Sequence, residues 1–394
     1  MPYRKNNDTD NMKKLIFAAA LVVAACACTP KEESFQDIKD RVFALADTQF
    51  KLLATELAPD VFPVNPEADG MLTTDNVTTW VSGFYPGSLW LTYEQTGDEE
   101  LLPLAERFTF ALDSLVNYEP DHDHGFRINC SYGQAYRITG DERYLPMIRY
   151  GADALAARFN PVVGCTKSWN WGGGKWTYPV IIDNMMNLEL LFNATKLFED
   201  VDYTDISLTH ARTTMRNHFR PDYSTWHLVD YSPEDGSVIG KQTVQGYADD
   251  SMWARGESWA LYGYTMMYRE TGETEFLEQA CHIADLLLEK LPEDGVPYWD
   301  FGCVDIPDTY RDASAGCIMA SAFLELSGLA GKPEYRAMAE KQIRTLASPE
   351  YLAAPGENHG FLLKHSVGHL PGDSQIDVPL TYADYYFLEA LTRL

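Results

Sequence analysis

Apolar residues recur at helical spacing along most of the chain, and clear strand-type alternation is scarce. A short polar signature interrupts this pattern, in which Thr-Gly is followed by acidic residues. It occurs around Gly97, Gly140 and Gly272, and a looser copy surrounds Gly331. Glycine can adopt the left-handed conformation that ends a helix, and acidic residues suit the start of the next helix. Each copy therefore predicts a junction between two helices.

The spacing of these junctions predicts the architecture. Gly97 and Gly140 are 43 residues apart, and Gly272 and Gly331 are 59 residues apart. If helical hairpins of roughly 50–60 residues are the repeating unit, a body of about 360 residues holds about six. Six hairpins can close into a ring, so we predict an all-α fold, an (α/α)6 barrel. An open α-solenoid is the alternative. The segment 382–388 favours closure, because it is too apolar for an exposed terminal helix.

The N-terminal segment predicts export. A positive start at Lys13 and Lys14 precedes an apolar run, 15–25, that is too short to span a bilayer. Small residues then lead into Cys26. This arrangement resembles a bacterial lipoprotein signal with Cys26 as the lipidated residue and Cys28 as the alternative. An ordinary cleaved secretory signal is the other interpretation.

These features define the expected organisation. We expect translation to start at Met12, and we expect a signal segment (1–28), a short tether (29–34) and one domain (35–394). The protein would then face the bacterial periplasm as a lipid-anchored lipoprotein. Its oligomeric state is left open.

Charge and cysteine content exclude several classes of partner. The chain has 31 basic and 58 acidic residues, a formal charge of −27. Binding to nucleic acid or to an anionic membrane surface is therefore not expected, and membrane contact would come through the lipid anchor alone. The five cysteines beyond the signal are odd in number, widely spaced and without a CxxC pair, so we expect no metal site. We expect buried thiols, with one disulfide as the alternative. These cysteines are Cys130, Cys165, Cys281, Cys303 and Cys317.

Two aspartates stand in unusual local settings. Asp123 lies between two histidines in a turn that contains glycine, and Asp183 follows two isoleucines at the start of an apolar helix. A buried carboxylate without a partner is costly, and two carboxyls in unlike environments suit acid/base chemistry on a sugar. For Asp183 alone, a helix cap or first-turn acid is the alternative interpretation.

Aromatic and polar residues gather just before the predicted helices. In a ring of hairpins these segments would share one mouth, and tryptophan and tyrosine faces there could stack on sugar rings. The alternative is that Trp80, Trp90 and Trp253 are core residues, and that Asp249 and Asp250 merely cap a helix.

Five long motifs carry a family resemblance. In chain order they read WVSGFYPGSLW, HDHGF, IIDNMMNLELLF, QGYADDSMWARGESWALYGY and DVPLTYADYYFLEAL. From about residue 78 to the C-terminus the chain resembles the unsaturated glucuronyl hydrolases of glycoside hydrolase family 88. The fold of that family is an (α/α)6 barrel.

The resemblance implies a site and a reaction. Asp123 and Asp183 would be the catalytic carboxylates. The substrate would be held by His227, Thr243, Gln245, Arg255 and Trp259, with Arg255 clamping the substrate carboxylate. The substrate would be a 4,5-unsaturated uronic acid at the non-reducing end of an oligosaccharide left by a lyase. Asp183 would protonate C4, water would add at C5, and the resulting hemiketal would open. No metal or organic cofactor is implied.

The sequence also bears on which sugars the protein would prefer. The segment 366–371 has no lysine or arginine, and Leu370 stands where a base would hold a sulfate, so we expect modest preference for sulfated sugars. An unsaturated rhamnogalacturonyl hydrolase acting on pectin fragments, and a non-catalytic glycan-binding lipoprotein, are the alternative functions.

Overall fold

The computed structural model describes residue 1 and residues 32–58, 60–67, 70–118 and 121–394. The chain divides into two units, Met1–Ile38 and Lys39–Leu394. The expected signal segment, Cys26 and the first part of the tether lie outside the described residues. In the first unit the described residues include the first turn of helix α2 (Phe35–Glu56). The domain boundary expected near residue 35 remains a prediction.

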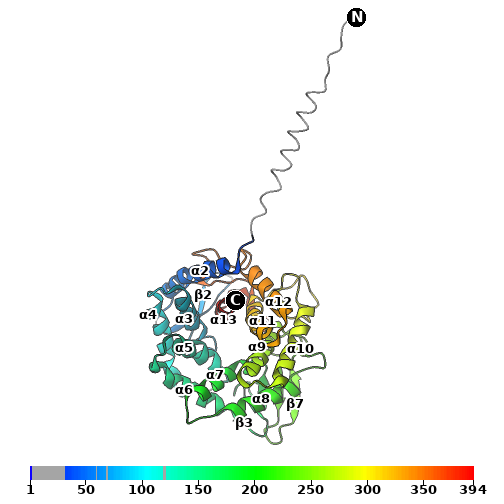
Figure 1. Ribbon diagram of the computed structural model, residues 1–394. Coiled ribbons are helices and arrows are strands. Elements are labelled where there is room, and N and C mark those ends of the chain that lie inside the picture. Colours follow the sequence, from blue (N-terminus) through cyan, green and yellow to red (C-terminus); the bar gives the residue numbers. More distant parts are fainter. Residues whose placement is uncertain (2–31, 59, 68–69, 119–120) are drawn as a thin grey trace. The chain divides into compact units, whose positions relative to one another are not determined.

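Six helical segments form a closed inner ring in the second unit (Figure 1). Each contacts the next along the chain, and the last, α13, packs against the first, α3. This contact excludes an open solenoid and confirms the (α/α)6 barrel. The inner segments are α3 (Phe84–Thr96), the π-helical η2 (Gly125–Gly133) with α5 (Gln134–Thr139), α7 (Asn184–Leu197), α9 (Ala254–Thr271), α11 (Ala313–Ala330) and α13 (Thr381–Thr392).

An outer helix precedes each inner one. Outer helices such as α10 and α12 bury one face, whereas α9 and α11 are buried nearly all round, as expected for helices with neighbours on every side. Helix α11 is also long and apolar enough to cross a membrane, but 72% of it is buried inside the barrel. Besides α2, the outer helices are α4 (Leu101–Ala111), α6 (Leu145–Ala156), α8 (Thr204–Asn217), α10 (Thr274–Lys290) and α12 (Pro333–Leu346). Short 3-10 turns lie at Leu112–Leu115, Glu142–Tyr144, Asn358–Gly360 and Leu370–Gly372.

The glycine signature marks one end of the barrel. Gly97, Gly140, Gly272 and Gly331 have φ values of 68°, 67°, 69° and 66°, and each ends an inner helix. The predicted helix ends are therefore confirmed. Because an outer helix returns the chain between consecutive inner helices, all inner helices run in the same direction. Their N-terminal ends consequently share one mouth, opposite the glycine caps.

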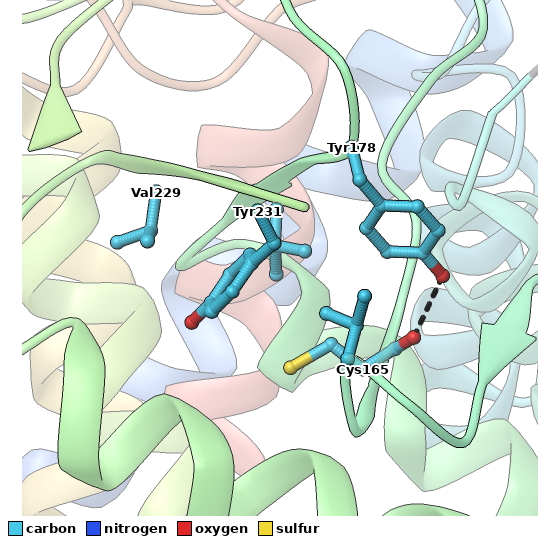
Figure 2. Packing of buried hydrophobic residues seen from close by; sticks show 6 residues of the cluster. Cys165, Tyr178, Val229 and Tyr231 are labelled. Atoms are coloured by element: carbon cyan, nitrogen blue, oxygen red, sulfur yellow. Dashed lines mark hydrogen bonds between the residues drawn. The ribbon is translucent and has the colours of Figure 1, made fainter. Parts of the chain in front are cut away.

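Short antiparallel strands follow the outer helices and lead into this mouth. They form three pairs, β1–β2, β3–β4 and β8–β9, and one three-stranded sheet, β5–β6–β7. Figure 2 shows the apolar cluster under β4, β5 and β6, where the Tyr178 hydroxyl donates to the Cys165 carbonyl at 2.8 Å. The strand bounds are β1 Val61–Pro66, β2 Leu72–Asn76, β3 Phe159–Asn160, β4 Cys165–Thr166, β5 Pro179–Ile181, β6 Leu228–Tyr231, β7 Val238–Gln242, β8 Ser366–His369 and β9 Ser374–Val378.

The five described cysteines are free thiols. Four are buried, as expected, and Cys281 is half-buried.

Candidate active site

Asp183 lies at the mouth, at the residue that precedes helix α7. The position is that of an N-cap, but its side chain makes no capping hydrogen bond, so the helix-cap interpretation does not account for it. The carboxyl is 9% exposed, and its Oδ2 atom has no hydrogen-bond partner within the part of the chain that the structure describes. A buried, unpaired carboxyl oxygen is a costly feature in the absence of a ligand.

An ion pair between Asp121 and Arg127 holds the segment that carries Asp123. Asp121 receives two hydrogen bonds from the Arg127 guanidinium, at 2.6 and 2.9 Å, and the pair is buried. The backbone N–H of Asp123 also donates to Asp121 Oδ1, at 3.0 Å. The His122 Nε2 atom lies 3.4 Å from Asp123 Oδ1. The backbone of Asp123 is therefore held by a neighbouring carboxylate.

Asn187 joins the two aspartate segments. One turn after Asp183 on α7, its Oδ1 accepts from the Phe126 N–H at 3.2 Å, and its Nδ2 lies 3.3 Å from His122 Nδ1. Gly125 sits against the same residue so closely that an added Cβ would lie 2.6 Å from Asn187 Cα. The two carboxyls thus belong to one packed unit. The i, i+4 spacing of Asp183 and Asn187 was visible in the sequence, but the sequence analysis did not select Asn187.

Burial raises the pKa of both aspartates. The pKa of Asp183 rises to about 7 because the carboxyl is desolvated, although the Arg255 charge opposes the shift. Desolvation also raises the pKa of Asp123 well above its ordinary value, and the charges of Asp121 and Asp183 raise it further. Two such carboxyls cannot both ionise cheaply at neutral pH. The pair can therefore keep a proton available for transfer.

His227 presents a hydrogen-bond donor toward Asp183. Burial lowers the pKa of His227 to about 3, so the imidazole is neutral. Its Nδ1 accepts the backbone N–H of Val244 at 3.0 Å, which leaves the proton on Nε2. That Nε2 lies 3.8 Å from Asp183 Oδ2 and has no hydrogen-bond partner in the described structure.

The remaining candidates from the 243–245 loop lie beside His227. Thr243 Oγ1 is 3.3 Å from His227 Nδ1, and the Gln245 N–H also reaches that nitrogen at 3.3 Å. The Gln245 side chain donates to the Gly368 carbonyl at 3.2 Å. Asp249, a possible helix cap from its sequence, accepts the Thr243 N–H at 2.9 Å and so holds this loop.

Trp259 forms the floor of the site. It is fully buried, with ring centroids 5.2 Å from Phe126 and 5.5 Å from Tyr386. Its indole N–H has no hydrogen-bond partner among the residues that the structure describes. The unpaired polar atoms of Asp183, His227 and Trp259 are the pattern expected where a polar ligand binds.

The role of Arg255 as a clamp for a substrate carboxylate remains a prediction, and its guanidinium also has partners within the protein. The guanidinium is buried and donates to the carbonyls of Val367 at 2.5 Å and Gly368 at 2.6 Å. Nη1 also contacts Asp312 Oδ2 at 3.2 Å. Arg255 therefore fastens strand β8 to the mouth, and it affects the site through its charge near Asp183.

Buried acids hold the other mouth loops. Asp300 accepts from the Tyr247 N–H at 2.8 Å, and Asp312 caps α11 through the Ser314 N–H at 3.0 Å. Glu257 accepts both donors of Thr225, two residues before His227, at 2.8 and 3.0 Å. The local sequence does not identify the partners of Glu257 and Asp300, because these are 32 and 53 residues away along the chain.

The tryptophans divide between core and site. Trp90 is fully buried, and its indole N–H donates to Thr109 at 2.9 Å, as expected of a core residue. Trp253 is buried against the His227 ring, with centroids 4.6 Å apart. Trp80 is half-buried and packs on Tyr382 at 4.9 Å.

A cavity of about 780 Å³ extends from Gly125 and Phe126 to Arg269 and Arg393 near the glycine-capped end of the barrel. Charged residues of its lining pair with one another: Arg137 contacts Glu94 at 2.7 Å, and Lys196 pairs with Glu270. These pairs join inner helices. Among the described residues, no cluster of three or more His, Cys, Asp or Glu side chains is arranged to hold a metal ion.

A closed double ring of helices with two buried carboxyls at an aromatic-rich mouth defines a carbohydrate-active enzyme of the (α/α)6 class. The family model described as Glycosyl Hydrolase Family 88 matches residues 59–389, and the chain belongs to that family.

Relatives of known structure or name agree with this membership. An unsaturated glucuronyl hydrolase of Formosa agariphila is 43% identical over 340 residues, which cover 86% of this chain and 82% of that protein. A crystal structure of an unsaturated glucuronyl hydrolase specific for heparin has a TM-score of 0.88 and 46% identity, covering 91% of this chain and 96% of that one. The glycosaminoglycan-degrading unsaturated glucuronyl hydrolase of Bacillus sp. GL1 has a TM-score of 0.83 and 30% identity, covering 91% and 96%.

Proposed function

We propose that this chain releases 4,5-unsaturated glucuronic acid from the non-reducing end of glycosaminoglycan oligosaccharides left by a lyase. The observation that carries the proposal is the buried Asp183 carboxyl of raised pKa, which lies 3.8 Å from the unpaired His227 Nε2–H in the same packed unit as a second carboxyl of raised pKa, Asp123. Family membership and relatives named unsaturated glucuronyl hydrolase support the same substrate class. The enzyme is a glycosidase that acts by hydrating an enol ether.

Asp183 is the proton donor in this proposal. With a pKa of about 7 it is substantially protonated at neutral pH, and it gives its proton to C4 of the C4–C5 double bond. Positive charge develops at C5, where water adds and loses a proton. Asp123 is the second carboxyl, and the pair positions the water. The hemiketal formed at C5 then opens and the remaining sugar leaves.

The neighbouring residues orient the sugar ring and regulate the acid. His227 donates from Nε2 to a ring oxygen, because its Nδ1 is occupied by the Val244 N–H. Trp259 supplies an indole N–H and the apolar floor. Arg255 opposes the rise in the pKa of Asp183 and fastens the 367–368 backbone, which also accepts from Gln245.

Substrate comparison tests the proposal. Loss of enol-ether absorbance should occur with unsaturated disaccharides from heparin or chondroitin. Turnover of only the unsaturated rhamnogalacturonyl disaccharide would contradict it, and binding of saturated sugars without turnover would indicate a binding protein. Sulfated substrates should be preferred only modestly over unsulfated ones, since His369 donates to the Val244 carbonyl at 3.1 Å and Leu370 is apolar.

We also propose that the protein is exported and lipid-anchored at Cys26, facing the periplasm. The support is the sequence pattern of residues 12–28 alone. Cells fed labelled palmitate should label the wild type and Cys28→Ser but not Cys26→Ser. Equal labelling of Cys26→Ser would assign the anchor elsewhere.

A further inference from the structure

The loop 167–176 has a composition unlike that of the rest of the chain. It reads KSWNWGGGKW, with three tryptophans, three glycines, two lysines and no acidic residue, in a chain with 58 acidic and 31 basic residues. The proposed reaction uses none of these side chains.

Contacts at both ends hold this loop beside the catalytic mouth. The Ser168 carbonyl accepts the His122 N–H at 2.8 Å, and Trp169 bridges to Asp121, so the loop runs next to the Asp123 segment. The hydrogen bond from Tyr178 to Cys165 closes its base (Figure 2). The loop is thus a fixed extension of the mouth.

Trp171 presents an exposed ring on a buried support. It stacks on Trp169 with centroids 5.6 Å apart and an interplanar angle of 14°, and Trp169 is itself buried and packs beside Trp176. Trp171 is 56% exposed. An indole that is this exposed contributes little to the core, and its rigid, amphipathic face is suited to a sugar ring.

Three successive glycines maintain this geometry. Gly172, Gly173 and Gly174 have φ values of 112°, 61° and 84°, in the region that other residues rarely adopt. A Cβ on Gly172 would lie 2.8 Å from the Trp176 ring. The turn therefore brings Trp171 and Trp176 together on one loop.

Basic side chains accompany the exposed ring. Arg158, Lys167 and Asn170 line an open hollow of about 350 Å³, and Asn170 is the neighbour of Trp171. The Lys175 ammonium lies 4.5 Å from the Trp176 ring centroid. In a chain with a net charge of −27, the two lysines of this loop without acidic residues favour an anionic ligand.

We propose that Trp171 binds a sugar beyond the one attached to the unsaturated residue, and that Lys167 attracts the carboxylate or sulfate of that part of the chain. The ligand class is an anionic unsaturated oligosaccharide of three or more sugars. The inference rests on the proposed function and deepens it: the enzyme prefers longer acidic fragments over disaccharides.

The ratio of kcat/KM for an unsaturated tetrasaccharide to that for the disaccharide of the same polymer tests this extension. In Trp171→Ala of the purified full chain the ratio should fall about tenfold, as expected for loss of one stacking contact. Lys167→Met should lower the ratio at low salt, and the difference should shrink in about 1 M salt, where charges are screened within about 3 Å. Leu329→Ala, at the end of α11 and 36% exposed, is the matched control and should keep the wild-type ratio.

Two results would overturn the inference, and they are distinguishable. A wild-type ratio in Trp171→Ala, with activity on both substrates, would remove the extended site and leave the proposed function standing. A wild-type chain inactive on both substrates would refute the proposed function and the extension together.

Discussion

Replacing Gly125 with alanine tests whether close backbone contact holds the two aspartate segments together. The new Cβ would lie 2.6 Å from both Cα and Oδ1 of Asn187, and real Cβ atoms do not approach other atoms so closely. Helix α7 is packed in the inner ring, so the 121–126 segment must retreat. Overpacking costs about 1–3 kcal/mol, and loss of the hydrogen bond from Phe126 to Asn187 adds about 1 kcal/mol. The expected destabilisation is about 2–4 kcal/mol.

The catalytic loss should be larger than the stability loss implies. A displacement of about 1 Å at a reacting group can cost about 10²-fold in rate, and Asp123 is two residues from the substitution. Urea denaturation would measure the free energy of unfolding, and enol-ether absorbance would measure kcat on the folded fraction. Gly328→Ala is the matched control: Gly328 is exposed near the C-terminal end of helix α11, no described atom would lie within 4 Å of its Cβ, and the variant should keep full activity. Wild-type kcat and stability in Gly125→Ala would refute the reasoning.

Three further outcomes are expected. Because the pKa of Asp183 is about 7 in the folded protein and 3.8 in the unfolded chain, the folded state holds the extra proton between those values. Its contribution to stability is therefore lost as pH rises from about 4 through 7, and kcat should fall above pH 7. Asp183→Asn should show a smaller drop in Tm between pH 5 and pH 8 than the wild type, and an equal drop would contradict the assignment. His227→Gln, whose amide can donate near the Nε2 position, should retain about tenfold more activity than His227→Ala, and equal losses in the two variants would argue against a donor role. The pH profile of wild-type activity should show no inflection near pH 6.5. Arg255→Met should lower the free energy of unfolding in urea by about 3–5 kcal/mol, since Asp312 is then buried without the Arg255 guanidinium. Adding Asp312→Asn should recover part of the loss, and strictly additive effects in the double variant would show that the pair is not coupled.

The helical part of the fold could be predicted from the sequence because its signals are local. The glycines at positions 97, 140, 272 and 331 predict helix ends because glycine readily adopts the left-handed backbone conformation, and each has a positive φ in the structure. Closure of the ring depends on packing of α13 against α3, almost 300 residues away in the chain. The apolar character of 382–388 indicated that this helix needed cover, but not which helix would cover it.

The site was predictable where motif and chemistry coincide. Asp123 and Asp183 could be selected because each stands in a local setting that is costly for a carboxyl. The role of Arg255 could not be derived in the same way. Its partners are Asp312, Val367 and Gly368, which are 57, 112 and 113 residues away, so the sequence carries no local sign that the donors are occupied.

The most direct test of the central claim follows the enol-ether absorbance of an unsaturated heparin or chondroitin disaccharide with the wild type and with Asp183→Asn. The wild type should consume the band, and Asp183→Asn should retain the fold and lose the activity. Undiminished activity in a folded Asp183→Asn would contradict the assigned acid, and an unchanged band with the wild type on every unsaturated glucuronyl disaccharide would contradict the proposed reaction.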